Sequence, residues 1–220
     1  MQRLTAVTLV CALSFALQGK QPPQADHSGQ AWVERSNTYT NMLLEVEFAH
    51  APERGSRQGV ARFDERISQP TLADELTLRR ELEATLAKID AAAPRETDKR
   101  VQEDLAILHK AYDLQFRQED YRLQHEVPFL NASAEVFQGL RGLLDDQVAP
   151  ERRPAALTRL RRYAGLEPGY QPFTELLKQR AREQIAKPGV TYPPKIEVET
   201  ELGRNSNYVK ESGRSSASTG

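Results

Sequence analysis

His125 and Glu126 are the residues of this sequence that come nearest to a known metal-binding pattern. In zinc peptidases one helix carries His-Glu and a second His four positions after the first, so that both imidazoles bind the ion and the Glu acts as base. Here position 129 is Phe129, and Pro128 interrupts the helix that would present the second ligand. We therefore predict no zinc site at this pair. The other histidines do not supply the missing ligand spacing: His27, His50 and His109.

Other polar residues that could act in catalysis lack the partners that such chemistry needs. Glu119-Asp120 and Asp145-Asp146 are pairs of adjacent residues, which point in different directions on a helix and do not share a substrate atom. We expect them to lie on solvated helix faces. A nucleophile-elbow context and a histidine partner are missing around the serines, which include Ser36, Ser68 and Ser133. The sequence therefore gives no catalytic, no cofactor-binding and no metal-binding residue.

An arginine-rich segment follows the second acidic pair. Its arginines alternate with the apolar residues of one helix stripe: Arg152, Arg153, Arg159, Arg161 and Arg162 with Leu157, Leu160 and Tyr163. Forked donors around an apolar stripe could clamp a carboxylate, including that of a peptide substrate. The interpretation that we favour is that the arginines pair with nearby acids and lay their stems along a helical bundle. Those acids are Asp145, Asp146, Glu151 and Glu167.

The charge balance limits the class of partner. The 220 residues contain 30 Lys and Arg against 31 Asp and Glu, which gives a formal net charge of -1. No long-range field would attract a polyanion, so a dedicated nucleic-acid-binding protein is excluded. Peptide and small-molecule partners stay open. The length suits one ordinary domain, and the 28% of charged residues suits amphipathic helices with solvated outer faces.

The first residues predict export. One Arg precedes an apolar run from Leu4 to Leu17, which has the length of a secretory signal and is shorter than the roughly 20 residues of a membrane span. We expect a signal peptide over residues 1–19 and a flexible linker over 20–31, with no stable membrane span after cleavage. Cys11 is the only cysteine and lies within the signal, so the mature protein would have no disulfide. Acylation of Cys11 and an uncleaved anchor are less favoured alternatives.

The apolar period indicates an all-α fold, an irregular bundle of about six or seven helices. Thr71, with Asp74 in the reciprocal capping-box position, and Asn131 are expected to cap helices, and Gly165 is expected to end one. The core positions of these helices include Leu76, Leu144 and Ile185. The glycine- and proline-rich segment 52–70 is expected to be a surface loop, and residues 210–220 a disordered tail. The helices are expected over about 32–51, 71–90, 101–125, 131–149, 151–164 and 172–187, with a weaker seventh over 196–209.

Several longer segments occur in a characteristic order. They read WVERSNTYTNMLLE, PERGSRQGVARFDERISQ, VPFLNASAEVFQGLRGLLDDQ, ERRPAALTRLRRYAGLEPGYQPFTELL and IEVETELGRNSNYV. This order resembles the amino-terminal half of a family of exported bacterial proteins, the domain-of-unknown-function family numbered 885. The likeness covers about Trp32 to Val209.

The resemblance carries an expectation about function. Members of the family resemble gluzincin-type zinc metallopeptidases, are mostly helical, and place their expected metal site in the carboxy-terminal half. None of those ligands matches a residue here. The resemblance therefore implies that residues 32–209 are the truncated, helical amino-terminal part of an exported protein of this kind, inactive alone, with zinc bound only in full-length relatives. The alternative is a stand-alone helical binding or scaffold protein of the bacterial periplasm.

Overall fold

The structure, a computed structural model, describes residues 31–217, and this part of the chain is all-α, as predicted. No strand occurs in it, only an isolated bridge between Glu126 and Thr191. The predicted signal peptide and linker lie outside the described residues, except that residue 31 begins the first helix. The α-helices are α1 (Ala31–His50), α2 (Pro52–Arg57), α3 (Leu72–Ala92), α4 (Lys99–His125), α5 (Ala132–Leu144), α6 (Ala155–Tyr163), α7 (Phe173–Ile185) and α8 (Lys195–Ala217). Short 3-10 helices are η2 (Ala61–Phe63), η3 (Ala93–Arg95) and η4 (Pro150–Arg152).

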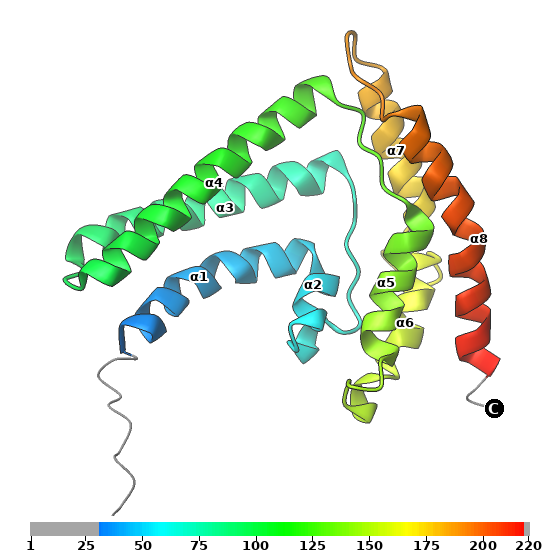
Figure 1. The fold of residues 1–220 in the computed structure, drawn as a ribbon, viewed down its shortest axis with the longest axis horizontal. Helices are drawn as coiled ribbons and strands as arrows, with labels where there is room; N and C mark the ends of the chain where they lie inside the picture. Colours follow the sequence, from blue (N-terminus) through cyan, green and yellow to red (C-terminus); the bar gives the residue numbers. More distant parts are fainter. Residues whose placement is uncertain (1–30, 218–220) are drawn as a thin grey trace, which may run out of the picture.

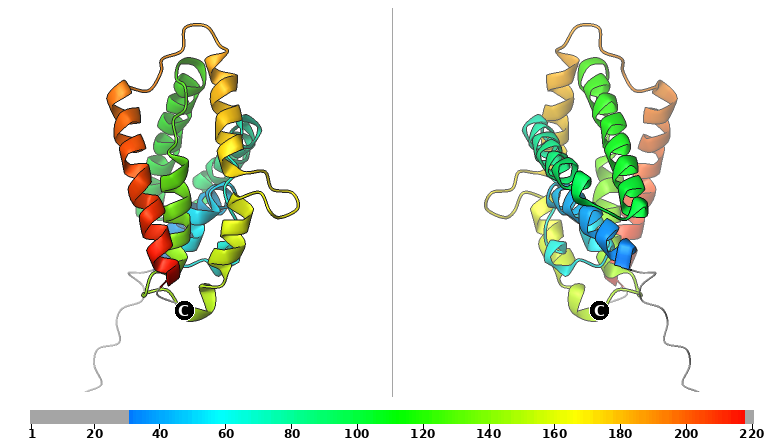
Figure 2. Two further views of the ribbon diagram at one scale, coloured as in Figure 1. Left: turned by 90° about the vertical axis from the view of Figure 1, so that its right-hand side faces the viewer. Right: turned by 90° about the vertical axis from the view of Figure 1, so that its left-hand side faces the viewer.

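The helices form two groups that meet at an angle (Figure 1). In the first group α1, α3 and α4 pack together around a core that includes Leu43, Leu82, Val101 and Phe116. In the second group α5 contacts α6, α7 and α8, and Tyr163 and Phe173 pack edge to face with ring centroids 5.3 Å apart. The side views show α8 and α7 on opposite sides of the second group (Figure 2). The short helix α2 touches both α1 and α5, so it joins the two groups.

The helix-capping signals of the sequence are mostly confirmed. The Thr71 side chain accepts a hydrogen bond from the Asp74 backbone N–H at the start of α3, and Asn131 accepts from the first turn of α5. Gly165 follows α6 with a φ of 69°, which favours glycine. The second contact of the predicted capping box, from the Thr71 backbone N–H to the Asp74 carboxylate, is wrong. That carboxylate lies 2.8 Å from Nδ1 of His50 instead. The acid therefore ties α3 to the end of α1 rather than to its own N-cap.

Segment 52–70 is not a surface loop, and this prediction is wrong. It forms α2 and η2, and it buries Glu53, Ser56, Phe63 and Asp64 between the two helix groups. Close packing here requires Gly55, because a Cβ at that position would lie 2.6 Å from a ring carbon of Phe63. The glycine that reads as a loop signal therefore permits a tight contact instead.

The structure differs from the prediction in which apolar residues are buried, in the number of helices and in the end of the last helix. Leu76, Leu144 and Ile185, expected in the core, are 42%, 43% and 46% exposed. The chain forms eight α-helices between residues 31 and 217, one more than the upper expectation, because α2 replaces the expected loop. Helix α8 continues to Ala217, into the segment 210–220 that was expected to be a disordered tail. None of the helices found between residues 31 and 217 combines the length and apolarity of a membrane span.

A glycine in α5 gives a first test of this packing. A Cβ on Gly139 would lie 2.3 Å from the Tyr163 hydroxyl oxygen. Because the buried Tyr163 ring cannot move away without losing its other contacts, we expect Gly139→Ala to lower the free energy of unfolding by about 1–3 kcal/mol. The matched control is Gly203→Ala in α8, where nothing lies within 4 Å of the added Cβ. It should stabilise the chain by up to about 1 kcal/mol through helix propensity. Urea denaturation followed by circular dichroism compares them, and equal effects would contradict the contact.

Candidate functional site

Arg159, at the centre of the arginine-rich segment, is buried rather than free to bind a ligand. Only 1% of the residue is exposed. Its guanidinium donates hydrogen bonds to three backbone carbonyls that come from both sides of the junction: Phe63 at 2.9 Å, Arg66 at 3.1 Å and Gly139 at 2.6 Å. Burial lowers the pKa of this guanidinium, whereas the nearby Glu53 and Asp64 carboxylates favour its charged form. Arg159 therefore fixes the segment after α2 against α5 and α6.

Arg152 makes a second connection across the same junction. It donates to both oxygens of Asp64, at 2.7 and 2.6 Å, and to the carbonyl of Ser56 at 2.9 Å. The Ser56 hydroxyl donates to Asp64 as well, at 2.7 Å. Although burial alone would raise it, the pKa of Asp64 is lowered by these hydrogen bonds and by the arginine charge. A buried ion pair with its remaining oxygens satisfied holds its geometry closely.

Glu53, at the start of α2, completes these contacts. One of its carboxylate oxygens accepts from the Tyr163 hydroxyl at 2.7 Å and from the backbone N–H and hydroxyl of Ser68, at 2.9 and 3.2 Å. Burial and the Glu53 charge raise the pKa of Tyr163 far above its ordinary value. We call the buried and half-buried polar residues of this region the junction network: Glu53, Ser56, Asp64, Ser68, Arg152, Arg159 and Tyr163.

The favoured interpretation of the arginines is confirmed for some of them and wrong for others. Arg153 lies 3.7 Å from Asp146, and Arg161 and Arg162 pair with Glu167 at 3.5 and 3.1 Å. Asp145 and Glu151 form no ion pair among the described residues. The two arginines of the junction network pair with residues far earlier in the chain, because segment 52–70 packs against their helix. Neither can clamp the carboxylate of a ligand.

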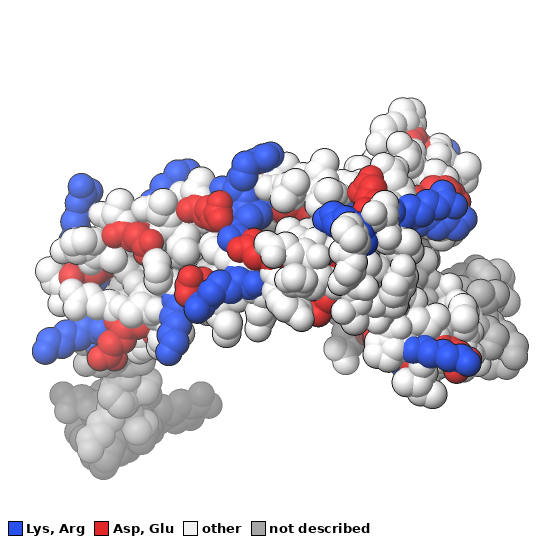
Figure 3. All heavy atoms as spheres, turned by 90° about the horizontal axis from the view of Figure 1, so that it is seen from above, with Lys and Arg blue, Asp and Glu red and all other residues white. Residues whose placement is uncertain are grey.

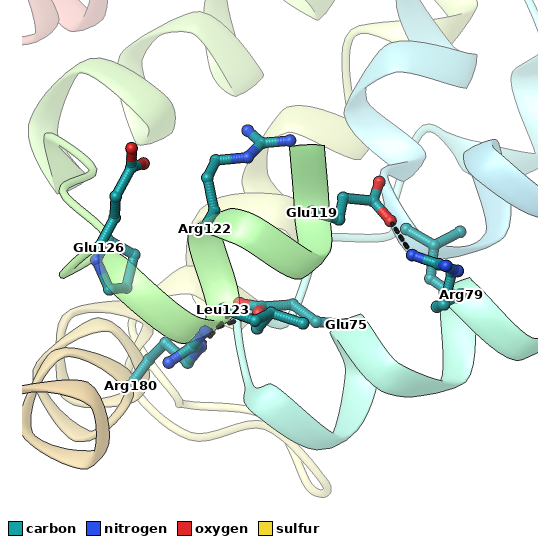
Figure 4. Close-up of a pocket in the computed structure, with 9 residues that line it drawn as sticks. Glu75, Arg79, Glu119, Arg122, Leu123, Glu126 and Arg180 are labelled. Carbon is teal, nitrogen blue, oxygen red and sulfur yellow. Dashed lines mark hydrogen bonds and ion pairs between the residues drawn. The ribbon is translucent and has the colours of Figure 1, made fainter. Parts of the chain in front are cut away.

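A cleft opens where α3 and α4 of the first helix group meet α7 of the second. It has a volume of about 260 Å³. Helix α3, the end of α4 and helix α7 line it, with Pro128 from the connection to α5 (Figure 4). Its apolar walls are Leu78, Leu123 and Pro128, and its charged lining consists of Glu75, Arg79, Glu119, Arg122, Glu126 and Arg180. A hollow of this kind, with apolar walls and a few charged groups, could hold a small ligand.

The charges of the cleft divide into paired and unpaired groups. Arg180, which is 5% exposed, donates two hydrogen bonds of 2.8 Å to the two oxygens of Glu75. Arg79 lies over the Phe116 ring at 4.0 Å and pairs with acids of α3 and α4, among them Glu119 at 3.5 Å. In contrast, Arg122 and Glu126 make no ion pair within the described part of the chain. Acidic and basic side chains also alternate over the face seen in Figure 3, without a patch of one sign.

The histidines do not meet. His109 and His125 stand sixteen residues apart on α4, so about 24 Å separates them along the helix. His109 contacts Asp90 at 3.1 Å, and the His125 ring packs on Tyr121 with centroids 4.8 Å apart. His50 has a carboxylate at each ring nitrogen, Asp74 at 2.8 Å and Glu81 at 3.2 Å. Within residues 31–217 no three His, Cys, Asp or Glu side chains converge as metal ligands.

None of the three serines considered above has a histidine partner among the described residues; each lies in a helix or in the junction network. Ser36 is buried, and its hydroxyl has no hydrogen-bond partner within the described part of the chain. Ser68 belongs to the junction network, and Ser133 lies in the first turn of α5, where its N–H donates to Asn131. The cleft residues were missed by sequence reasoning apart from Glu119 and Glu126. The signal in the sequence was limited to one basic and one acidic residue a helical turn apart, Arg122 and Glu126, next to the helix-ending Pro128.

Comparison with known protein families gives a match over most of the chain. The family described as bacterial protein of unknown function (DUF885) matches residues 52–219. No curated protein and no solved structure matches the chain. The match begins later than the likeness seen in the sequence from Trp32 and extends past Val209. Since it covers more than half of the 220 residues, the chain belongs to the DUF885 family of bacterial proteins of unknown function.

Proposed function

We propose that the described helices form a substrate-binding wall of an exported, zinc-metallopeptidase-like protein and do not carry its metal centre. The observation that supports this most directly is the cleft between α3, α4 and α7, which receives side chains from both helix groups. The junction network holds the two groups in one orientation, as a wall with a shaped surface requires. Family membership alone names no activity, so the zinc-peptidase relation is inferred from the sequence resemblance.

The substrate of this protein would be a peptide or another small polar molecule, met outside the cytoplasm. The cleft offers both signs of charge beside apolar walls, which suits a peptide or another small polar molecule better than a nucleic acid. Zinc would be bound by relatives that carry the metal-binding motif and not by the helices described here. The signal-like amino-terminal sequence supports a place of action in the periplasm or outside the cell.

Metal content and hydrolysis of the purified chain test this function. After incubation with zinc and removal of free metal, we expect less than one equivalent of bound zinc and no cleavage of a mixture of unstructured peptides. One zinc per chain, together with cleavage that a chelator abolishes, would overturn the proposal. His125→Ala and Glu126→Gln serve as controls for adventitious metal binding at the His-Glu pair, since neither substitution should change the result.

A second candidate is a stand-alone periplasmic binding or scaffold protein that recognises a helical partner. It is favoured by three exposed apolar residues at seven-residue spacing on α4: Ile107, Leu114 and Tyr121. Such spacing places them on one side of the helix. Lys110 lies beside this stripe, so the partner helix would carry an acidic residue next to its apolar ones.

Solution behaviour separates the two candidates. A stand-alone protein should unfold in one sharp, cooperative thermal transition as a monodisperse monomer. A wall that lacks its normal neighbours should associate or show molten behaviour, because its apolar surface stays exposed. If association occurs and Leu114→Lys abolishes it, the α4 stripe is the surface responsible.

A further inference from the structure

We propose that the cleft between α3, α4 and α7 binds an amino acid or short peptide through both of its terminal charges. Arg122 would bind the carboxylate and Glu126 would bind the ammonium group. This inference rests on the proposed substrate-binding function and specifies the ligand class and the two residues that recognise it.

The first argument is that the other charges of the cleft are already satisfied. Arg180 uses two hydrogen bonds of 2.8 Å on Glu75, and this buried arginine also lies 3.4 Å from Gln184. Arg79 is held by Glu83 at 2.6 Å and by Asp120 at 3.2 Å, with its guanidinium against Phe116. A ligand would have to break these contacts to use either arginine. They therefore build the wall and leave recognition to other groups.

The second argument is the position of the two unpaired charges. Arg122 belongs to the last turn of α4 and Glu126 is its C-cap residue, four positions later. Both side chains extend from this end of α4 in the direction opposite to Arg180 (Figure 4). The same two residues also line a shallower hollow, beside Arg117 and Tyr121. A ligand that reaches the rim of the cleft thus meets one cation and one anion.

The third argument is the balance of charge and size. The lining has three arginines and three glutamates, so its net charge is zero and it offers no general attraction for an anion. A ligand with one charge would satisfy one residue and desolvate the other without compensation, whereas a zwitterion satisfies both. The volume of about 260 Å³ lies just below the usual range of small-molecule sites, so the cleft fits a ligand as small as an amino acid or dipeptide. Leu78, Leu123 and Pro128 would contact its apolar side chain.

Calorimetric titration with three forms of one dipeptide tests the inference. The probes are Ala-Leu with free termini, its N-acetyl form and its C-terminal amide. We expect the free dipeptide to bind the full chain about tenfold or more tightly than either blocked form, since each block removes one charged contact. Arg122→Gln should abolish the difference between the acid and the amide. Glu126→Gln should abolish the difference between the free and the acetylated amine.

Controls keep a negative result interpretable. Lys110→Gln and Glu103→Gln remove one exposed charge each from α4 outside the cleft and should leave all three affinities unchanged. Absence of binding by the free dipeptide, or equal binding of all three forms, would overturn the inference. So would a response to Arg122→Gln alone, because it would indicate a simple anion site. These outcomes concern binding only, so they are distinguishable from failure of the proposed function, which is read from zinc content and hydrolysis.

Discussion

Replacing Arg159 by Met is expected to lower the free energy of unfolding by about 3–5 kcal/mol, the largest effect of any single substitution considered for this chain. The side chain is almost fully buried, and methionine fills a similar volume without a donor. The carbonyls of Phe63, Arg66 and Gly139 would all lose their hydrogen bonds from this residue. The carboxylates of Glu53 and Asp64 would also lose a nearby positive charge.

Two related variants control for this prediction. Arg161→Met removes the same group from an arginine whose side chain is 57% exposed, and it should change stability by no more than about 0.5 kcal/mol. Arg159→Lys keeps the charge but lacks the planar fork, so it should recover only part of the loss. Urea denaturation with two optical probes measures all three. If Arg159→Met costs no more than Arg161→Met, the junction network does not hold the two helix groups together.

Stability should fall steeply above pH 10 because of two buried tyrosines. Burial is the main cause that raises the pKa of Tyr112 and of Tyr163 above the ordinary value of 10.0, with the Glu47 and Glu53 carboxylates adding to it. A raised folded-state pKa means that the stability from these groups is fully present below pH 10 and is lost as the pH rises further. Each tyrosine that ionises only on unfolding lowers the unfolding free energy by about 1.4 kcal/mol per pH unit. Together they predict a slope of about 2.7 kcal/mol per unit.

Phenylalanine variants identify the groups responsible. Tyr163→Phe or Tyr112→Phe should remove about half of the alkaline slope, and the double variant should remove most of it. Tyr163→Phe also loses the hydrogen bond to Glu53, so its stability at neutral pH should be lower while its slope is smaller. Urea midpoints between pH 9 and 11, with tyrosinate absorbance recorded in parallel, give both quantities. An unchanged slope in the double variant would contradict the assignment.

The junction network and the cleft are linked through the same two helix groups. Arg159 and Arg152 fix α5 and α6 against the segment that leads into α3, while Arg180 fixes α7 against α3 itself. The cleft lies between α3, α4 and α7, so its shape depends on both connections. A substitution in the network should therefore weaken dipeptide binding as well as folding. Direct changes at Arg122 or Glu126 should affect binding alone.

Local sequence patterns determined the helices and their ends. The caps at Thr71 and Asn131 and the glycine after α6 involve contacts within about four residues, which can be read directly from spacing. The all-α class follows from the same local period. The apolar positions Leu76, Leu144 and Ile185 were misplaced because the period defines a stripe but not the width that a neighbouring helix covers.

Tertiary structure alone decided which polar residues are buried and which charges stay free. Arg152 meets Asp64 across 88 positions of the chain, and Tyr163 meets Glu53 across 110. Arg180 and Arg122 look alike in the sequence, yet one finds Glu75 on a distant helix and the other finds no acid in the described chain. Helical periodicity depends on neighbours within one or two turns, whereas the pairing of a charge depends on which remote element packs against it. For that reason the all-α class and the DUF885 type can be read from the sequence, whereas the cleft arises from the packing of the two helix groups.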